Sequence, residues 1–125
     1  MRRIAIVEDN PDNRLLATAL LEGMYTCTEY ETGIDALEGL QQDTPCLVLL
    51  DISLPGMDGV ETLRHIRANP ALRHLPVIAL TAHAMTGDRE KYIAAGFDDC
   101  VTKPIVDESI LLGAIARALD GAAVR

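Results

Sequence analysis

A continuous apolar run from Cys46 to Leu50 constrains the fold of this chain more than any other feature. It stops at the carboxylate of Asp51, and the turn-forming sequence Leu-Pro-Gly follows at residues 54–56. An apolar run without alternation is typical of a strand buried on both faces, which occurs where helices cover both sides of a parallel sheet. We therefore expect Asp51 at the carboxyl end of a central strand, where open α/β sheets bind ligands. A single Asp after a strand is also a common turn former, so other strands must bring chemistry to the same edge.

Apolar runs and helical periodicities alternate along the rest of the chain. The predicted strands are Ile4–Val7, Tyr25–Glu29, Cys46–Leu50, Pro76–Leu80 and Asp98–Thr102. The predicted helices begin near Asp12, Thr32, Asp58, Asp88 and Asp107 and end near Gly23, Leu40, Pro70, Gly96 and Leu119. Five strands alternating with five helices predict a doubly wound α/β fold with a parallel sheet.

The same patterns predict helix caps and buried faces. Asp12 is expected to cap the first helix, whose apolar residues between positions 15 and 20 recur at helical spacing. Thr32 is expected to cap the second helix. Arg67 is expected to face outward from the third helix, and Ile110 is expected to face the core from the last one.

Length and charge limit the possible functions. A chain of 125 residues fits one domain, residues 1–125, and its net charge of −8 argues against a nucleic-acid-binding surface. No apolar run approaches the length of a membrane span, and the N-terminus has no signal-peptide pattern. The three cysteines are odd in number and lack metal-binding spacing, which predicts reduced thiols in the cytoplasm. We therefore expect a cytoplasmic protein that binds neither nucleic acid nor a membrane.

Four of the predicted strands end in polar residues that together can act on a phosphoryl group. Glu8 and Asp9 follow the first strand, Asp51 the third, Thr81 the fourth and Lys103 the fifth. The carboxyl ends of parallel strands meet at one edge of the sheet, so these side chains are expected to converge. Three carboxylates favour a hard cation, and Mg²⁺ fits because it keeps waters that a phosphate can replace. With a hydroxyl donor and a lysine charge, the set predicts phosphoryl transfer, in which a carboxylate can be the nucleophile.

The motifs resemble, in order and spacing, those of the two-component receiver (response regulator) domain. They are Glu8-Asp9-Asn10, the stretch Asp-Ile-Ser-Leu-Pro-Gly-Met-Asp-Gly at 51–59, Thr81-Ala82 and Lys103-Pro104. The resemblance covers about residues 3–119 and implies a flavodoxin-like fold with strand order 2-1-3-4-5. By this resemblance Asp51 is the phosphoacceptor, and Glu8, Asp9, Asp51 and the backbone carbonyl of Ser53 hold Mg²⁺.

The resemblance also implies how the other residues act. Thr81 would bind a phosphoryl oxygen after transfer, Lys103 would pair with the phosphoryl group, and the Lys103–Pro104 peptide would be cis. The implied function is a switch that takes a phosphoryl group from a histidine kinase or a histidine phosphotransfer protein. It then changes its affinity for a downstream protein. Such a domain catalyses its own phosphorylation and dephosphorylation, but it is a signalling module rather than an enzyme.

One position departs from the family pattern. Cys100 stands three residues before the lysine, where the family usually has a Tyr or Phe that turns inward on activation. Without that ring, we expect phosphorylation to reshape mainly residues 81–86 and the start of the following helix. Tyr92 and Phe97 are interpreted as packing residues, and the three histidines as surface residues, of which His83 could border the site.

Two alternative functions compete with the switch, and the extent of the protein is a separate question. A degenerate receiver that binds partners constitutively would also carry these motifs, and an acylphosphate assay separates it from the phosphorylated switch. An aspartyl-phosphate hydrolase of the haloacid dehalogenase type is disfavoured, because Asp51 follows the third strand and Ile52-Ser53 replaces the second acid of that motif. The start at Met1 slightly favours a stand-alone receiver over a piece of a larger protein.

Overall fold

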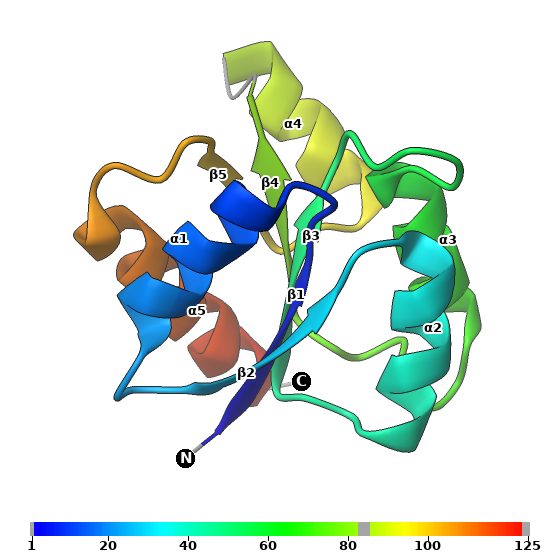
Figure 1. The fold of residues 1–125 in the computed structure, drawn as a ribbon. Coiled ribbons are helices and arrows are strands. Elements are labelled where there is room, and N and C mark those ends of the chain that lie inside the picture. The colour runs from blue at the N-terminus through cyan, green and yellow to red at the C-terminus, as the bar shows by residue number, and fades with distance from the viewer. Residues whose placement is uncertain (1, 83–85, 124–125) are drawn as a thin grey trace.

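A parallel sheet of five strands forms the centre of the computed structural model, which describes residues 2–82 and 86–123 (Figure 1). The strands are β1 (Arg3–Val7), β2 (Thr26–Tyr30), β3 (Leu47–Asp51), β4 (Val77–Thr81) and β5 (Asp99–Thr102). They lie in the order β2-β1-β3-β4-β5, and all neighbours are parallel. This is the flavodoxin-like order of a doubly wound fold, as predicted. The strand β2 begins and ends one residue later than expected.

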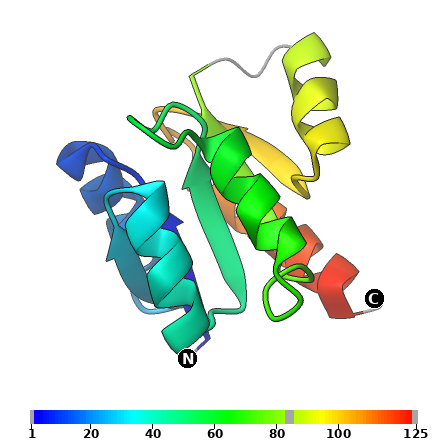
Figure 2. The same ribbon diagram turned by 90° about the vertical axis from the view of Figure 1, so that its right-hand side faces the viewer.

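Helices cover both faces of the sheet. They are α1 (Pro11–Leu21), α2 (Gly33–Gln42), α3 (Gly59–Ala68), α4 (Thr86–Ala95) and α5 (Glu108–Ala123). Figures 1 and 2 show α1 and α5 on one face and α2 and α3 on the other, with α4 beside α3. Among the residues the structure describes, no helix combines the length and apolar character needed to cross a bilayer.

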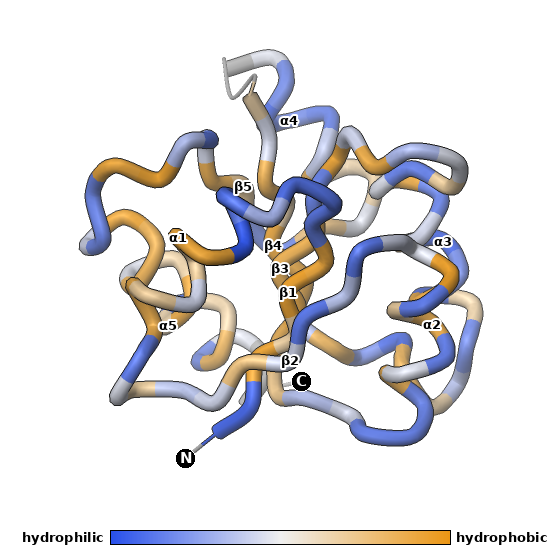
Figure 3. Tube along the Cα trace, in the orientation of Figure 1, coloured by the Kyte–Doolittle hydropathy of each residue, from blue (hydrophilic) through white to orange (hydrophobic). Residues whose placement is uncertain are grey.

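The strand β3 is fully buried and separates two hydrophobic cores. Because side chains alternate along a strand, Leu47 and Leu49 join the core under α1 and α5, whereas Val48 and Leu50 join the core under α2, α3 and α4. In Figure 3 the central strands are accordingly the most hydrophobic part of the chain. The uninterrupted apolar run thus has the two-sided burial that its sequence predicted.

The caps of α1 and α2 test two predictions. The prediction of Asp12 as the cap of α1 is wrong, because Asn10 holds that position. Its Oδ1 accepts hydrogen bonds from the backbone N–H groups of Asp12, at 2.8 Å, and Asn13, at 3.2 Å. Pro11 begins the helix, and a proline is well suited to the first helical position because no N–H is needed there. Thr32 caps α2 as predicted, since its hydroxyl accepts from the backbone N–H of Asp35 at 3.0 Å.

Apolar positions in two helices, α1 and α5, face solvent against expectation. Leu15 is 68% exposed, because the buried stripe of α1 runs through Ala17 and Leu21 instead. Ile110, expected in the core, is 56% exposed. The buried residues of α5 form a stripe at spacings of three, four and seven, which leaves Ile110 outside it: Leu111, Ala114, Ile115 and Ala118.

Arg67 does not face outward, so that prediction is also wrong. Its guanidinium is half-buried and donates hydrogen bonds to the carbonyl oxygens of Gly96, at 2.8 Å, and Leu75, at 2.6 Å. It also pairs with the carboxylate of Asp98 at 3.0 Å. The turns that precede β4 and β5 leave these carbonyl groups outside the sheet ladder, and the arginine satisfies them.

Candidate functional site

Three carboxylates meet at the carboxyl ends of β1 and β3, which are neighbours in the sheet. One carboxylate oxygen from each of Glu8, Asp9 and Asp51 lies within 4.8 Å of the other two. Glu8 and Asp51 are only 1% exposed, whereas Asp9 faces solvent. Exposed acidic groups often cluster without binding anything, but two buried carboxylates at this spacing are costly unless a cation neutralises them.

The loop after β3 holds Asp51 in place. Its Oδ1 accepts a hydrogen bond from the backbone N–H of Ser53 at 3.0 Å. The backbone N–H of Gly59 donates to the carbonyl of Ile52 at 3.0 Å, which brings the start of α3 against the strand end. A Cβ at residue 59 would collide with the backbone carbonyl oxygen of Asp51. Glycine is therefore required at this close approach.

Lys103 extends from the end of β5 into the carboxylate cluster. Its Nζ lies 3.0 Å from Oδ1 of Asp51 and 3.1 Å from Oε1 of Glu8. Burial lowers the pKa of Lys103, but its hydrogen bonds to these two carboxylates outweigh burial and raise the pKa above its usual value. The lysine is therefore a fixed positive charge. The Lys103–Pro104 peptide is cis, as expected.

The charges around Glu8 show how crowded the cluster is. Burial, together with a hydrogen bond shared with Asp51, raises the pKa of Glu8 above its ordinary value. A single lysine thus does not fully offset the cluster. Because all the donor atoms are carboxylate oxygens, the cluster fits a hard divalent cation such as Mg²⁺.

Thr81 reaches the same edge from β4. It is 2% exposed and lies one residue beyond Leu80, which pairs with Asp51 in the sheet. The backbone N–H of Lys103 donates to the carbonyl of Thr81 at 2.7 Å, so β4 and β5 end together. The structure therefore brings every site residue predicted from the sequence to one edge. His83 lies outside the described residues, as do residues 84 and 85 of the segment 81–86.

Arg14 belongs to this region, although the sequence analysis did not single it out. Its Nη1 donates to the backbone carbonyl oxygens of Glu8, at 2.8 Å, and Asp9, at 3.2 Å. The signal in the sequence was an arginine about one turn into the helix that follows the acidic pair, a place where it can reach back to the loop.

Cys100 lies in the core under α4 together with the two aromatic residues. The rings of Tyr92 and Phe97 pack edge to face with centroids 6.1 Å apart, which confirms that both are packing residues. Burial raises the pKa of the Cys100 thiol, so the thiol stays protonated and unreactive near neutral pH.

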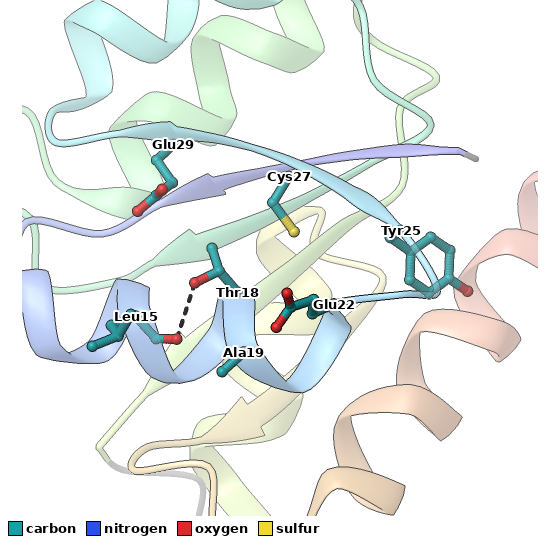
Figure 4. Close-up of a pocket in the computed structure, with 7 residues that line it drawn as sticks. All are labelled: Leu15, Thr18, Ala19, Glu22, Tyr25, Cys27 and Glu29. Carbon is teal, nitrogen blue, oxygen red and sulfur yellow. Dashed lines mark hydrogen bonds between the residues drawn. The ribbon is translucent and has the colours of Figure 1, made fainter.

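A shallow groove of about 380 Å³ runs between α1 and β2 (Figure 4). Its lining residues come from these two elements and their connection: Leu15, Thr18, Ala19, Glu22, Tyr25, Cys27 and Glu29. None of the three clustered carboxylates lines it, so this groove and the chemical site are separate features.

Comparison with known proteins agrees with this geometry. A family model described as the response regulator receiver domain matches residues 4–116. The sensor protein GacS of Pseudomonas syringae pv. syringae is 42% identical over 112 residues, which are 86% of this chain. The chain spans only 12% of the length of that sensor protein. The polar-differentiation response regulator DivK of Brucella ovis is 38% identical over 105 residues, which cover 83% of this chain and 85% of DivK.

A solved structure with the same fold carries a metal. The receiver domain of the sensor histidine kinase PA1611 from Pseudomonas aeruginosa PAO1 is 36% identical and aligns with a TM-score of 0.85. The alignment covers 95% of this chain and 98% of that one. That structure is described with a magnesium ion coordinated in its active-site cleft.

Proposed function

Because this chain belongs to the response regulator receiver domain family, whose members are signalling modules, we propose that it is a phosphorylation-dependent switch. Asp51 accepts a phosphoryl group from a phosphohistidine donor in a Mg²⁺-dependent reaction, and its phosphorylation changes the affinity for a partner protein. The observation that carries the proposal is the buried Asp51 carboxylate, held 3.0 Å from the Lys103 ammonium beside two further acids. The switch is proposed to be one receiver domain formed by residues 1–125.

The proposed metal ligands are the carboxylates of Glu8, Asp9 and Asp51 and the backbone carbonyl of Ser53. When bound, Mg²⁺ supplies charge neutralisation for the phosphoryl oxygens and for the crowded carboxylates. The acidic cluster supports this assignment, as does the magnesium ion described for the PA1611 receiver domain.

Hydrogen-bond donors hold one oxygen of the Asp51 carboxylate, which orients the other oxygen for attack on phosphorus. Oδ1 accepts from both the Ser53 N–H and the Lys103 ammonium, so Oδ2 is the proposed nucleophile. A new O–P bond forms at Oδ2 while the P–N bond to the donor histidine breaks and the imidazole takes up a proton. Lys103 and the Thr81 hydroxyl then bind the phosphoryl oxygens, and phosphoryl transfer depends mainly on such positioning.

The proposed phosphodonor is a histidine kinase or a histidine phosphotransfer protein, and the proposed target is a second protein. The similarity to GacS and to DivK is consistent with a receiver that sits in a kinase or acts alone. Residues of α1 and of the loop after β5 line a small cavity together with Glu8 and Lys103, so these two elements are the proposed docking surface for the donor protein. Such a donor would meet the chain in the cytoplasm, which also suits its free thiols.

The test is phosphorylation followed by mapping of the modified residue. The chain is incubated with a phosphohistidine donor protein or with acetyl phosphate, each with and without Mg²⁺. We expect one acid-stable, base-labile phosphoryl group on Asp51, present only with Mg²⁺ and lost in Asp51→Asn. The exposed Asp35→Asn serves as a charge-matched control. Unchanged labelling of Asp51→Asn would refute the assignment, and partner binding without any labelling would favour a degenerate receiver.

A further inference from the structure

We propose that Arg14 is a positioning residue that holds the metal-binding loop in its ligating conformation through the backbone carbonyls of Glu8 and Asp9. This inference rests on the proposed Mg²⁺ site. It assigns to α1 a part in the chemistry of the strand ends, although Arg14 itself touches neither the metal nor the phosphoryl group.

The guanidinium contacts two consecutive peptide groups of the loop between β1 and α1. Nη1 donates to the carbonyl oxygens of Glu8 and Asp9 at 2.8 and 3.2 Å. These are the two residues whose carboxylates enter the acidic cluster after β1. Fixing both carbonyl groups fixes the orientation of both peptide planes, and thereby the directions in which the two side chains leave the backbone.

The other side of the guanidinium is attached to the edge strand. Nε lies 3.3 Å from a carboxylate oxygen of Glu29 in β2, and Nη2 lies 3.4 Å from one of Glu31, just after β2. Figure 4 shows Glu29 on the side of β2 that faces α1. The Arg14 side chain is 13% exposed, against 48% and 71% for its two acidic partners. Exposed ion pairs contribute little, so the partly buried hydrogen bond to the Glu8 carbonyl is the stronger anchor.

Positioning matters here because the loop carries like charges. Without a metal, carboxylates within 4.8 Å of one another repel. A shift of the loop that separates the carboxylates lowers this repulsion. The two hydrogen bonds that Arg14 donates to the loop carbonyls oppose this movement, so metal binding has to order the loop less. Loss of partners that orient metal ligands commonly costs about 10- to 100-fold in metal affinity.

The direction of the change in Mg²⁺ affinity distinguishes a positioning role of Arg14 from a purely electrostatic one. Arg14→Met removes a cation near the site, and by Coulomb's law alone this tightens the binding of Mg²⁺. If Arg14 positions the loop, the same substitution weakens binding instead. Arg14→Lys keeps the charge, but its single ammonium cannot replace a planar fork with donors toward both the loop and the acids.

The experiment is a calorimetric titration of Mg²⁺ into the whole chain, with backbone amide chemical shifts of the metal-free protein as the second readout. Arg14→Met and Arg14→Lys are compared with Arg64→Met, which changes the charge equally at an exposed position of α3. We expect both Arg14 variants to bind Mg²⁺ about 10-fold or more weakly, with displaced Glu8 and Asp9 amide shifts. Arg64→Met is expected to stay within about 2-fold of the wild type.

Two results would overturn the inference: wild-type or tighter Mg²⁺ binding by Arg14→Met, or full recovery of the affinity by Arg14→Lys. If Arg14→Met does not fold, the folded Arg14→Lys decides by the same comparison. The Asp9→Asn variant tests the proposed metal site separately from the role of Arg14. Equal Mg²⁺ binding by the wild type and Asp9→Asn would refute the proposed metal site itself. Normal binding by the wild type, loss in Asp9→Asn and no change in Arg14→Met would refute only the role of Arg14.

Discussion

The replacement of Asp99 by Asn tests how the structure joins β5 to the helices on either side of it. Asp99 is 5% exposed and lies at the start of β5. Its carboxylate pairs with Arg89 of α4 at 2.6 Å and with Arg117 of α5 at 3.3 Å. It also accepts from the backbone N–H of Cys100 at 2.8 Å. Asparagine has nearly the same shape and can keep the amide contact, so the substitution removes mainly the negative charge.

The expected cost follows from how exposed the partners are. A buried hydrogen bond to a charged group contributes about 1.5 to 3 kcal/mol, whereas an exposed ion pair contributes about 0 to 1 kcal/mol. The arginine side chains are 51% and 70% exposed, so each pair belongs nearer the lower range. We therefore expect Asp99→Asn to lower the free energy of unfolding by about 1 to 2 kcal/mol at neutral pH. For a domain of this size that is roughly 4 to 8 °C in Tm.

The pH dependence gives the sharper test. Burial raises the pKa of Asp99, but the Cys100 N–H and the two arginines outweigh it, so the pKa lies below the ordinary 3.8. Because this pKa is lowered in the folded state, the Asp99 carboxylate makes its full contribution to the free energy of unfolding above pH 3.8. That contribution is lost as the pH falls through the pKa of Asp99 in the folded protein. The difference between wild type and Asp99→Asn should therefore be full at pH 6 and shrink below about pH 4.

Urea unfolding of both proteins from pH 2.5 to pH 7 measures this difference. Asp120→Asn, an exposed charge on α5, is the matched control and should change stability by less than about 0.5 kcal/mol. A difference for Asp99→Asn that is absent at pH 7, or that stays constant down to pH 2.5, would refute the reasoning.

Three further predictions concern the site and its loop. Asp9→Asn should sharply weaken Mg²⁺ binding while leaving Tm unchanged or higher, because it relieves like-charge repulsion; a clear drop in Tm would contradict this. Asn10→Ala removes the α1 cap and should cost about 1 kcal/mol in urea unfolding, whereas an unchanged midpoint would show that Pro11 alone starts the helix. Adding beryllofluoride, a phosphoryl mimic, should shift amide resonances mainly at residues 81–86, since Cys100 lacks a ring to carry the change; equal shifts over 98–119 would argue against this.

The fold could be predicted because the relevant signals are local. An unbroken apolar run requires burial on both faces, and a chain of alternating strands and helices has few ways to satisfy that requirement. The same logic predicts from the sequence that Glu8, Asp51 and Lys103 lie together. Their convergence depends only on the strands being parallel, so positions far apart in the sequence could be assigned to one edge.

The wrong prediction for Arg67 and the omission of Arg14 have a common physical cause. Arg67 faces inward because of carbonyl groups in turns far along the chain, at Leu75 and Gly96. Arg14 likewise acts on a loop and on acids contributed by β2. A periodicity within one helix reports which side is apolar, but it contains no information about a distant backbone group that needs a donor. Long polar side chains with tertiary partners are therefore among the residues that a helical pattern misplaces.

The two hydrophobic cores have a consequence for how this chain can diversify. Leu49 and Leu50 are adjacent in the sequence, yet they pack in different cores on opposite sides of the sheet. Substitutions that share no packing partners have nearly additive effects on stability. Lineages can therefore alter the layer formed by α1 and α5 and the layer formed by α2, α3 and α4 largely independently. New recognition surfaces can arise on either layer while the strand ends that both layers border keep the same chemistry.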